Sequence, residues 1–110
     1  MKYVGSHLII DLWTERSLND SNYIESILKD CVEKIGATLL SSHFHNFCPI
    51  GVTGVLILEE SHISIHTWPE YNYAAIDIFT CRNIKSDNAI AILKKSFDPT
   101  KIRIQKIQRG

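Results

Sequence analysis

The sequence predicts an α+β fold, a two-layer αβ sandwich in which a mainly antiparallel sheet carries two helices on one face. Two segments place apolar residues at the 3.6-residue spacing of a helix, and five or six others alternate or form short apolar runs typical of strands. The predicted order is strand, helix, four strands, helix, strand. With 110 residues and no repeat or linker, we expect one domain spanning residues 1–110.

The first strand is expected over residues 7–13, an apolar run that ends at a polar segment. A helix follows, with N-cap oxygens within residues 20–22, Asn22 and Glu25 at capping-box spacing, and Gly36 just after its last turn. One stripe of this helix is apolar and is expected to face the core; it consists of Ile24, Ile27, Leu28, Cys31, Val32 and Ile35.

Four strands are expected between the two helices. The first covers residues 37–47, and period-2 counting places Leu39, Ser41, His43, His45 and Phe47 on one side without showing which side is the core. Residues 48–51 predict a turn, because Pro49 lacks an N–H donor and Gly51 permits a positive φ. The other strands are expected over residues 52–60, 62–68 and 72–81, with Pro69 between the last two.

A second helix is expected to begin at Ser86 and Asp87 and to end at Asp98–Pro99. Its inward residues would be Ala89, Ile90, Leu93 and Phe97. The tail over residues 101–108 reads as a last, half-exposed strand. Two helices on one face leave the other face of the sheet uncovered, and we expect a second copy of the chain to cover it.

Composition excludes several classes of protein. Twelve basic and twelve acidic residues give no net charge, which argues against a nucleic-acid or acidic-membrane partner. The N-terminal apolar run is too short for a signal peptide or a membrane span, so we expect a cytoplasmic protein. Three widely spaced cysteines predict neither a disulfide framework nor a thiolate zinc site, and Cys31 is assigned to the core.

Residues 59–81 hold most of the reactive side chains and form the candidate site. On the predicted fifth strand, Cys81 shares a side with Asp77 and Phe79, although a free cysteine is often only a small buried hydrophobe. The four histidines at positions 43, 45, 62 and 66 allow a metal cluster, but no acidic or thiolate spacing accompanies them. A serine beside a histidine also suggests an acyl-transfer nucleophile, but the G-x-S-x-G elbow is absent.

The stretch ESHISIHTWPEY at residues 60–71 resembles the signature of the pyruvoyl-dependent S-adenosylmethionine decarboxylases in their short prokaryotic form. The resemblance continues through YAAIDIFTC at residues 73–81 and back through FCP at 47–49 and GVTGV at 51–55. It is strong over roughly residues 40–81; the flanks match by element order and length.

The resemblance implies a proenzyme that makes its own cofactor. The Ser61 hydroxyl would attack the carbonyl of Glu60, and elimination would then leave a β chain of residues 1–60 and an α chain of residues 61–110 that begins with a pyruvoyl group. By family match, His66 would be the base of the elimination, and Thr53, where relatives often carry Ser, would be a helping hydroxyl. No PLP and no metal are expected.

For turnover, the resemblance implies that the amine of S-adenosylmethionine forms a Schiff base with the pyruvoyl group, that CO2 leaves, and that Cys81 returns a proton. Phe47 and Trp68 would flank the adenine and the sulfonium, and Glu70 would bind the ribose hydroxyls. The decarboxylated product would feed spermidine synthesis. The family forms homodimers, so one site could draw residues from two subunits.

Four departures from the family pattern leave alternatives open. The sequence has Asn72 where relatives favour Gly, Cys48 where they favour Ser, and Arg82 where a Gly is common, and the chain is shorter than most relatives. The substrate could therefore be free arginine or ornithine, as for other members of the superfamily. A catalytically silent regulatory relative is a further alternative, although Ser61 and Cys81 are both retained.

Overall fold

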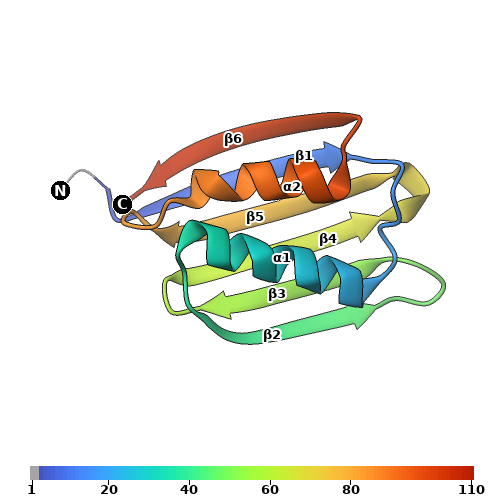
Figure 1. Cartoon of the computed structure of the whole chain (residues 1–110), viewed down its shortest axis with the longest axis horizontal. Coiled ribbons are helices and arrows are strands. Elements are labelled where there is room, and N and C mark those ends of the chain that lie inside the picture. The colour runs from blue at the N-terminus through green and yellow to red at the C-terminus, as the bar shows by residue number, and fades with distance from the viewer. Residues whose placement is uncertain (1–2) are drawn as a thin grey trace.

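The computed structural model describes residues 3–110 and contains one six-stranded sheet with two helices. Along the chain the elements are β1 (Gly5–Trp13), α1 (Ser21–Ile35), β2 (Leu39–Asn46), β3 (Val52–Leu58), β4 (Ser61–Trp68), η1 (Pro69–Tyr71), β5 (Tyr73–Cys81), η2 (Ser86–Asn88), α2 (Ala89–Phe97) and β6 (Lys101–Arg109). The strand order in the sheet is β2-β3-β4-β5-β1-β6, and each neighbouring pair is antiparallel (Figure 1).

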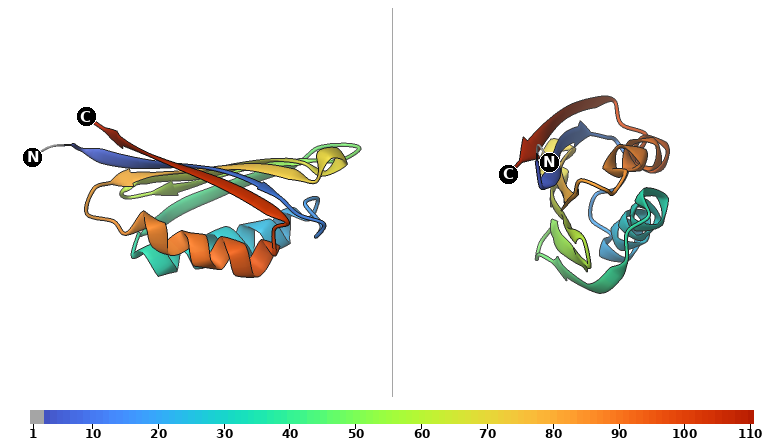
Figure 2. Two further views of the ribbon diagram at one scale, coloured as in Figure 1. Left: turned by 90° about the horizontal axis from the view of Figure 1, so that it is seen from above. Right: turned by 90° about the vertical axis from the view of Figure 1, so that its left-hand side faces the viewer.

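Both helices lie on one face of the sheet, which confirms the predicted fold class (Figure 2). Alternate residues of β1, β4 and β5 point to this face and are buried there, as the period-2 pattern of a half-covered sheet requires. The largest of them are Leu8, Ile10, Leu12, Ile63, Ile65, Ile76 and Ile78, and they meet Ile24, Leu28, Leu93 and Phe97 of the helices. Burying these side chains is the main force that holds the helices on the sheet.

The ends of α1 follow the sequence signals, with one difference. The Asp20 side chain accepts hydrogen bonds from the N–H groups of Asn22 and Tyr23, and Gly36 ends the helix in the left-handed conformation at φ 77°. The predicted capping box is wrong, because the Glu25 carboxylate instead accepts from the hydroxyl of Ser42 on β2 and pairs with Lys29. Glu25 therefore ties α1 to the sheet.

Two other local expectations are corrected. The pairing of β2 with β3 shifts register between Leu39 and Ser41, so Leu39 packs against the core while His43 and His45 lie on the opposite face. The helix α2 begins at Ala89 after the short η2, and Asn88 rather than Ser86 precedes it. Ser86 is buried, and Asp87 pairs with Lys106 of β6 at 3.0 Å. Ile90 is only half-buried.

No helix of the described residues covers the other face of the sheet, which we call the open face (Figure 2). Its central rows carry polar and aromatic side chains from four strands, namely His62, Ser64, His66 and Trp68 of β4, Tyr73, Asp77, Phe79 and Cys81 of β5, His7, Asp11 and Trp13 of β1, and Arg103 of β6. Within residues 3–110, neither helix is long and apolar enough to cross a membrane.

Candidate active site

The turn between β3 and β4 consists of Glu59 and Glu60, and Ser61 follows it with an unusual backbone conformation. Its φ is 132°, a region that L-residues rarely occupy. The other residues with positive φ are glycines or, like Asn72 and Asp98, residues that end a helix. A non-glycine residue held there costs of order 1–3 kcal/mol. Ser61 therefore has a strained backbone conformation directly after the Glu60–Ser61 peptide, at the turn of the β3–β4 hairpin.

The carbonyl of Glu60 accepts a hydrogen bond from the backbone N–H of Cys81, with 3.1 Å between nitrogen and oxygen. The strand register makes this contact, because Ser61 pairs with Thr80 across β4 and β5. The Cys81 side chain lies on the open face, on the side shared with Asp77 and Phe79, and is half-buried. The strand register therefore brings the backbones of Glu60, Ser61 and Cys81 together, and it adds a backbone donor that no side-chain motif could have indicated.

Two buried hydroxyls lie in the cross-strand row that contains Ser61. Thr80 pairs with Ser61 on one side and with Ser6 of β1 on the other. Within residues 3–110, Ser6 Oγ and Thr80 Oγ1 are the buried side-chain oxygens that make no hydrogen bond. Leaving a buried hydroxyl without a partner costs roughly 1–3 kcal/mol. This row therefore places two buried polar groups beside Ser61.

A second group of predicted site residues gathers at the other end of the same strands. Thr53 on β3 and His66 on β4 face each other, with 3.1 Å between Thr53 Oγ1 and His66 Nδ1. They line a hollow of about 330 Å³ together with Phe47, Ile50, Gly51, Thr67, Trp68 and Glu70. An imidazole hydrogen-bonded through one ring nitrogen is held in a fixed orientation, which suits a group that moves a proton with the other.

The aromatic side chains at this end of the sheet are partly exposed to solvent. Phe47 is 49% exposed and Trp68 is 40% exposed. The Phe47 ring meets the ring of His45 edge-on at 4.6 Å, and Trp68 stacks on Tyr73 with ring centroids 5.4 Å apart. Tyr73 supports the Trp68 ring, a role that the sequence did not suggest. The two residues lie directly opposite each other on β4 and β5, and this cross-strand pairing could have indicated the contact.

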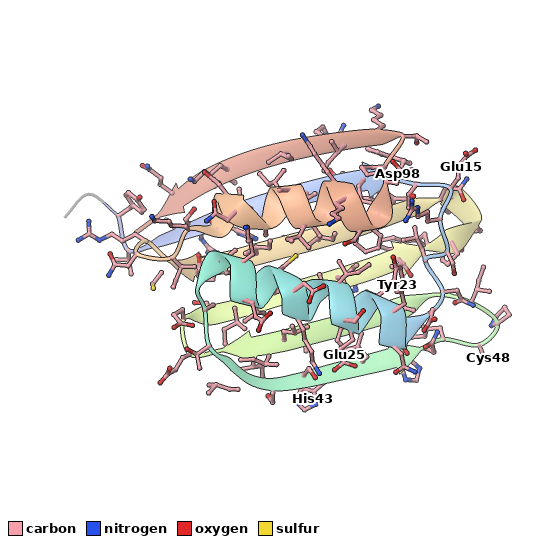
Figure 3. The ribbon with its side chains drawn as sticks, in the orientation of Figure 1. Glu15, Tyr23, Glu25, His43, Cys48 and Asp98 are labelled. Atoms are coloured by element: carbon pink, nitrogen blue, oxygen red, sulfur yellow. The ribbon has the colours of Figure 1, made fainter. Side chains whose placement is uncertain are left out.

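The segment that carries Phe47 is held by a residue far away in the sequence. Asn19, in the connection between β1 and α1, accepts a hydrogen bond from the Gly51 N–H through its side-chain oxygen at 2.8 Å. Its backbone oxygen accepts from the Asn46 side chain at 2.9 Å. Gly51 has φ 113°, as the predicted turn requires, and the exposed Cys48 lies at the tip of this loop (Figure 3).

The two groups of site residues are therefore far apart within one chain. The β3–β4 turn lies at one end of the sheet, while the β2–β3 loop and η1 lie at the other (Figure 1). Ser61 and His66 are five positions apart on one strand, which corresponds to roughly 16 Å of extended backbone. His66 of a given chain cannot contact Ser61 of the same chain in this fold.

Between the two groups, the open face holds a network of charged and polar side chains. Asp11 accepts from the Tyr73 hydroxyl and pairs with Arg103 at 3.1 Å, and His7 lies 2.9 Å from Asp77. Burial, followed by the hydrogen bond to Asp11, raises the pKa of Tyr73 to about 12. Tyr73 therefore keeps its proton at neutral pH and remains a donor.

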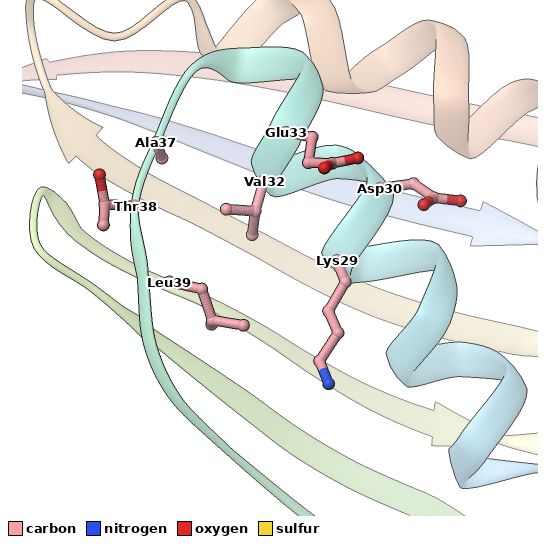
Figure 4. A pocket seen from close by; sticks show the side chains of 7 residues that line it. All are labelled: Lys29, Asp30, Val32, Glu33, Ala37, Thr38 and Leu39. Atoms are coloured by element: carbon pink, nitrogen blue, oxygen red, sulfur yellow. The ribbon is translucent and has the colours of Figure 1, made fainter.

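Other candidate sites carry less chemistry. Burial raises the pKa of the Cys31 thiol to about 12, and this fully buried residue belongs to the core as predicted. Among the described residues, no three His, Cys, Asp or Glu side chains come close enough together to hold a metal ion. A second hollow of about 520 Å³ lies between α1 and β2 and is lined by Lys29, Asp30, Val32, Glu33, Ala37, Thr38 and Leu39 (Figure 4). It contains none of the predicted site residues.

Comparison with known proteins gives one consistent result. A family described as S-adenosylmethionine decarboxylase matches residues 6–110. A relative from Methanococcus maripaludis, named S-adenosylmethionine decarboxylase proenzyme, is 47% identical over 100% of this chain and 93% of its own length. A relative of the same name from Thermotoga petrophila is 40% identical over 100% of this chain and 87% of its own. The crystal structure of the adenosylmethionine decarboxylase from Aquifex aeolicus superposes with a TM-score of 0.88 at 36% identity, covering 100% of this chain and 93% of that one.

Proposed function

The chain belongs to the S-adenosylmethionine decarboxylase family of pyruvoyl-dependent carboxy-lyases, and we propose that it is a proenzyme that cleaves itself between Glu60 and Ser61 and then releases CO2 from S-adenosylmethionine. The observation that carries this proposal is the geometry of the Glu60–Ser61 bond. An unfavourable backbone conformation at Ser61, its adjacent hydroxyl and an N–H already bonded to the Glu60 carbonyl support an intramolecular acyl shift.

In the first step, the Ser61 oxygen attacks the carbonyl carbon of Glu60 and its proton is transferred to the departing nitrogen. The C–N bond breaks, so an ester joins Glu60 to the Ser61 side chain and the amine of residue 61 is free. Negative charge develops on the Glu60 oxygen during the attack, and the Cys81 N–H at 3.1 Å is placed to stabilise it. Relief of the unfavourable φ at Ser61 favours the same direction.

In the second step, a base removes the Cα proton of residue 61, the Cβ–O bond breaks, and Glu60 leaves as a carboxylate. The remaining enamine tautomerises, and water releases its nitrogen as ammonia, which leaves a pyruvoyl group on the chain of residues 61–110. The residues around Ser61 fit a polar group of this kind, because the hydroxyls of Thr80 and Ser6, which make no hydrogen bond within residues 3–110, lie in the same row. Once formed, the group supplies an electron-withdrawing ketone that accepts the electron pair left when CO2 departs.

We assign the base of this second step to His66, held by Thr53, and infer that it comes from a partner subunit. A distance of roughly 16 Å along β4 prevents His66 from serving Ser61 of its own chain. If two copies pack through their open faces around a two-fold axis, each end that carries Ser61 can meet an end that carries His66. A homodimer would thus contain two composite sites, and the aromatic side chains of the open face would be buried.

The roles in turnover follow the same division. Cys81, on the open face beside the cleavage point, is the proposed proton donor to the substrate's α-carbon. Phe47 and Trp68 of the partner are proposed to flank the adenine and the sulfonium cation, and Glu70 to bind the ribose hydroxyls. Their exposed rings border a hollow that is open to a ligand.

The intact mass of the purified protein under denaturing conditions tests the proposal. We expect two species, one ending at Glu60 and one beginning with a pyruvoyl group at position 61. The cleaved protein should then release labelled CO2 from carboxyl-labelled S-adenosylmethionine and not from labelled arginine or ornithine. A chain that stays uncut after long incubation, or a cleaved protein that acts only on a free amino acid, contradicts the proposal.

A further inference from the structure

We propose that the side chain of Glu60 is a positioning residue for self-cleavage, because its carboxylate clamps the cleavage turn to the backbone of Thr38. The inference rests on the proposed self-cleavage and assigns the Glu60 carboxylate a role separate from that of the Glu60 carbonyl. It begins from two hydrogen bonds. Glu60 Oε1 accepts from the Thr38 N–H at 2.9 Å, and the Glu59 N–H donates to the Thr38 carbonyl at 3.0 Å.

These two bonds fix both residues of the turn to a single peptide segment outside the hairpin. Thr38 lies in the connection between α1 and β2, beside the β3–β4 turn (Figure 4). This connection is itself anchored, because the N–H groups of Gly36 and Ala37 bond to carbonyls of the last turn of α1, and Ile35 is buried in the core. The turn is thereby held against an element that cannot easily move.

The clamp acts on the bond that is cut. Glu60 is held on both sides of its Cα: the carboxylate at Thr38, and the carbonyl at the N–H of Cys81. The next residue, Ser61, is in the strained conformation at φ 132°. Releasing the carboxylate would let the two-residue turn rotate, relax the strain at Ser61, and draw the carbonyl away from its donor. The clamp therefore preserves the reactive geometry until the acyl shift occurs.

A glutamate suits this position for two reasons. Its carboxylate accepts a charge-assisted hydrogen bond from a peptide N–H, which is stronger than a neutral one. Its side chain has the length that reaches Thr38, whereas an aspartate is one methylene shorter. Glu60→Gln keeps an acceptor oxygen at the same reach without the charge, and Glu60→Asp keeps the charge without the reach. The pair of substitutions separates the hydrogen bond from the charge.

The experiment follows the cutting of newly made chains. Wild type, Glu60→Ala, Glu60→Gln, Glu60→Asp and the neighbouring control Glu59→Ala are synthesised in a cell-free system with a short labelled pulse, quenched in denaturant at intervals, and separated by mass. We expect Glu60→Ala and Glu60→Asp to be cut on the order of tenfold more slowly than wild type, since one hydrogen bond to a charged group is lost. Glu60→Gln and Glu59→Ala should stay within about threefold of wild type.

A second measurement identifies the affected step. Hydroxylamine cuts an ester that has accumulated, so it should speed cleavage of His66→Ala, in which the elimination is blocked, and should not speed cleavage of Glu60→Ala. Circular dichroism of each variant in the uncut Ser61→Ala background checks the fold. If Glu60→Ala does not fold, the cutting rates of Glu60→Asp and Glu60→Gln test the clamp. Equal cutting rates of all Glu60 variants would overturn the clamp but not the proposed self-cleavage. Wild-type cutting of Glu60→Asp together with slow cutting of Glu60→Gln would do the same. An uncut wild-type chain overturns the proposed function as well.

Discussion

Replacing Thr80 by valine should stabilise the uncut protein, although Thr80 lies in the row beside the proposed cleavage point. The side chain is fully buried, and Thr80 Oγ1 makes no hydrogen bond within the described part of the chain. Valine has nearly the same shape, so the substitution removes the cost of the unpartnered hydroxyl without opening a cavity. That cost is roughly 1–3 kcal/mol, and we expect the free energy of unfolding to rise by about 1–2 kcal/mol. The midpoint of thermal unfolding should rise by at least about 4 °C.

The assay is urea unfolding of Ser61→Ala and of Ser61→Ala/Thr80→Val, because we expect Ser61→Ala to keep the chain uncut. Both proteins are measured at one concentration, since concentration affects the stability of a dimer. Thr14 supplies a matched control, because it is a buried threonine whose hydroxyl donates to the Phe97 carbonyl and accepts from the Arg16 N–H. Thr14→Val should lower the free energy of unfolding by about 1–3 kcal/mol. If Thr80→Val destabilises the protein as Thr14→Val does, the Thr80 hydroxyl has a partner and the reasoning is refuted.

Three further predictions concern the proposed site. Co-expression of differently tagged Ser61→Ala and His66→Ala chains should yield cut His66→Ala chains in mixed dimers only, because a mixed dimer has one complete composite site. The intact mass of the chains in each purified dimer measures the cutting. Cutting of the His66→Ala chain in its own homodimer would contradict the partner's role. Cys81→Ala should be cut at near the wild-type rate, because the backbone N–H bonded to the Glu60 carbonyl remains, but should release labelled CO2 at least about tenfold more slowly; full turnover would remove Cys81 as the proton donor. Asn19→Ala should raise KM by about threefold to tenfold with little change in kcat or in the rate of cutting, because the loop that carries Phe47 loses a hydrogen bond. An unchanged KM would show that this loop keeps its conformation without Asn19.

Much of the architecture could be predicted from local patterns. The apolar stripe from Ile24 to Ile35, the Asp20 cap and the glycine at position 36 each act within a few residues, and the structure confirms them. Strand alternation likewise identified the shared side of Asp77 and Cys81. The departures arose where a distant partner competed: Glu25 bonds to Ser42 instead of forming a capping box, and the bulge near Leu39 moves that side chain to the core.

The family was also predicted from the sequence and is confirmed, because the ESHISIHTWPEY stretch is contiguous and therefore visible without a fold. The individual roles of its residues stay predictions. Residue spacing suggested that Ser61 and His66 belong to one site, yet an extended strand places them at opposite ends of the sheet. Adjacency in sequence and adjacency in space differ here because a strand advances more than twice as far per residue as a helix.

The sequence by itself determined the helices, the strands, the uncovered sheet face and the reactive side chains, since each depends on side-chain type and short-range periodicity. Only the tertiary structure decided which backbone groups meet. The contact of the Cys81 N–H with the Glu60 carbonyl and the hold of Thr38 on the Glu60 carboxylate both join segments about twenty residues apart. Every residue type other than proline carries a backbone N–H, so no sequence pattern marks these two donors. The β4–β5 register selects the first, and the packing of the α1–β2 connection against the β3–β4 turn selects the second.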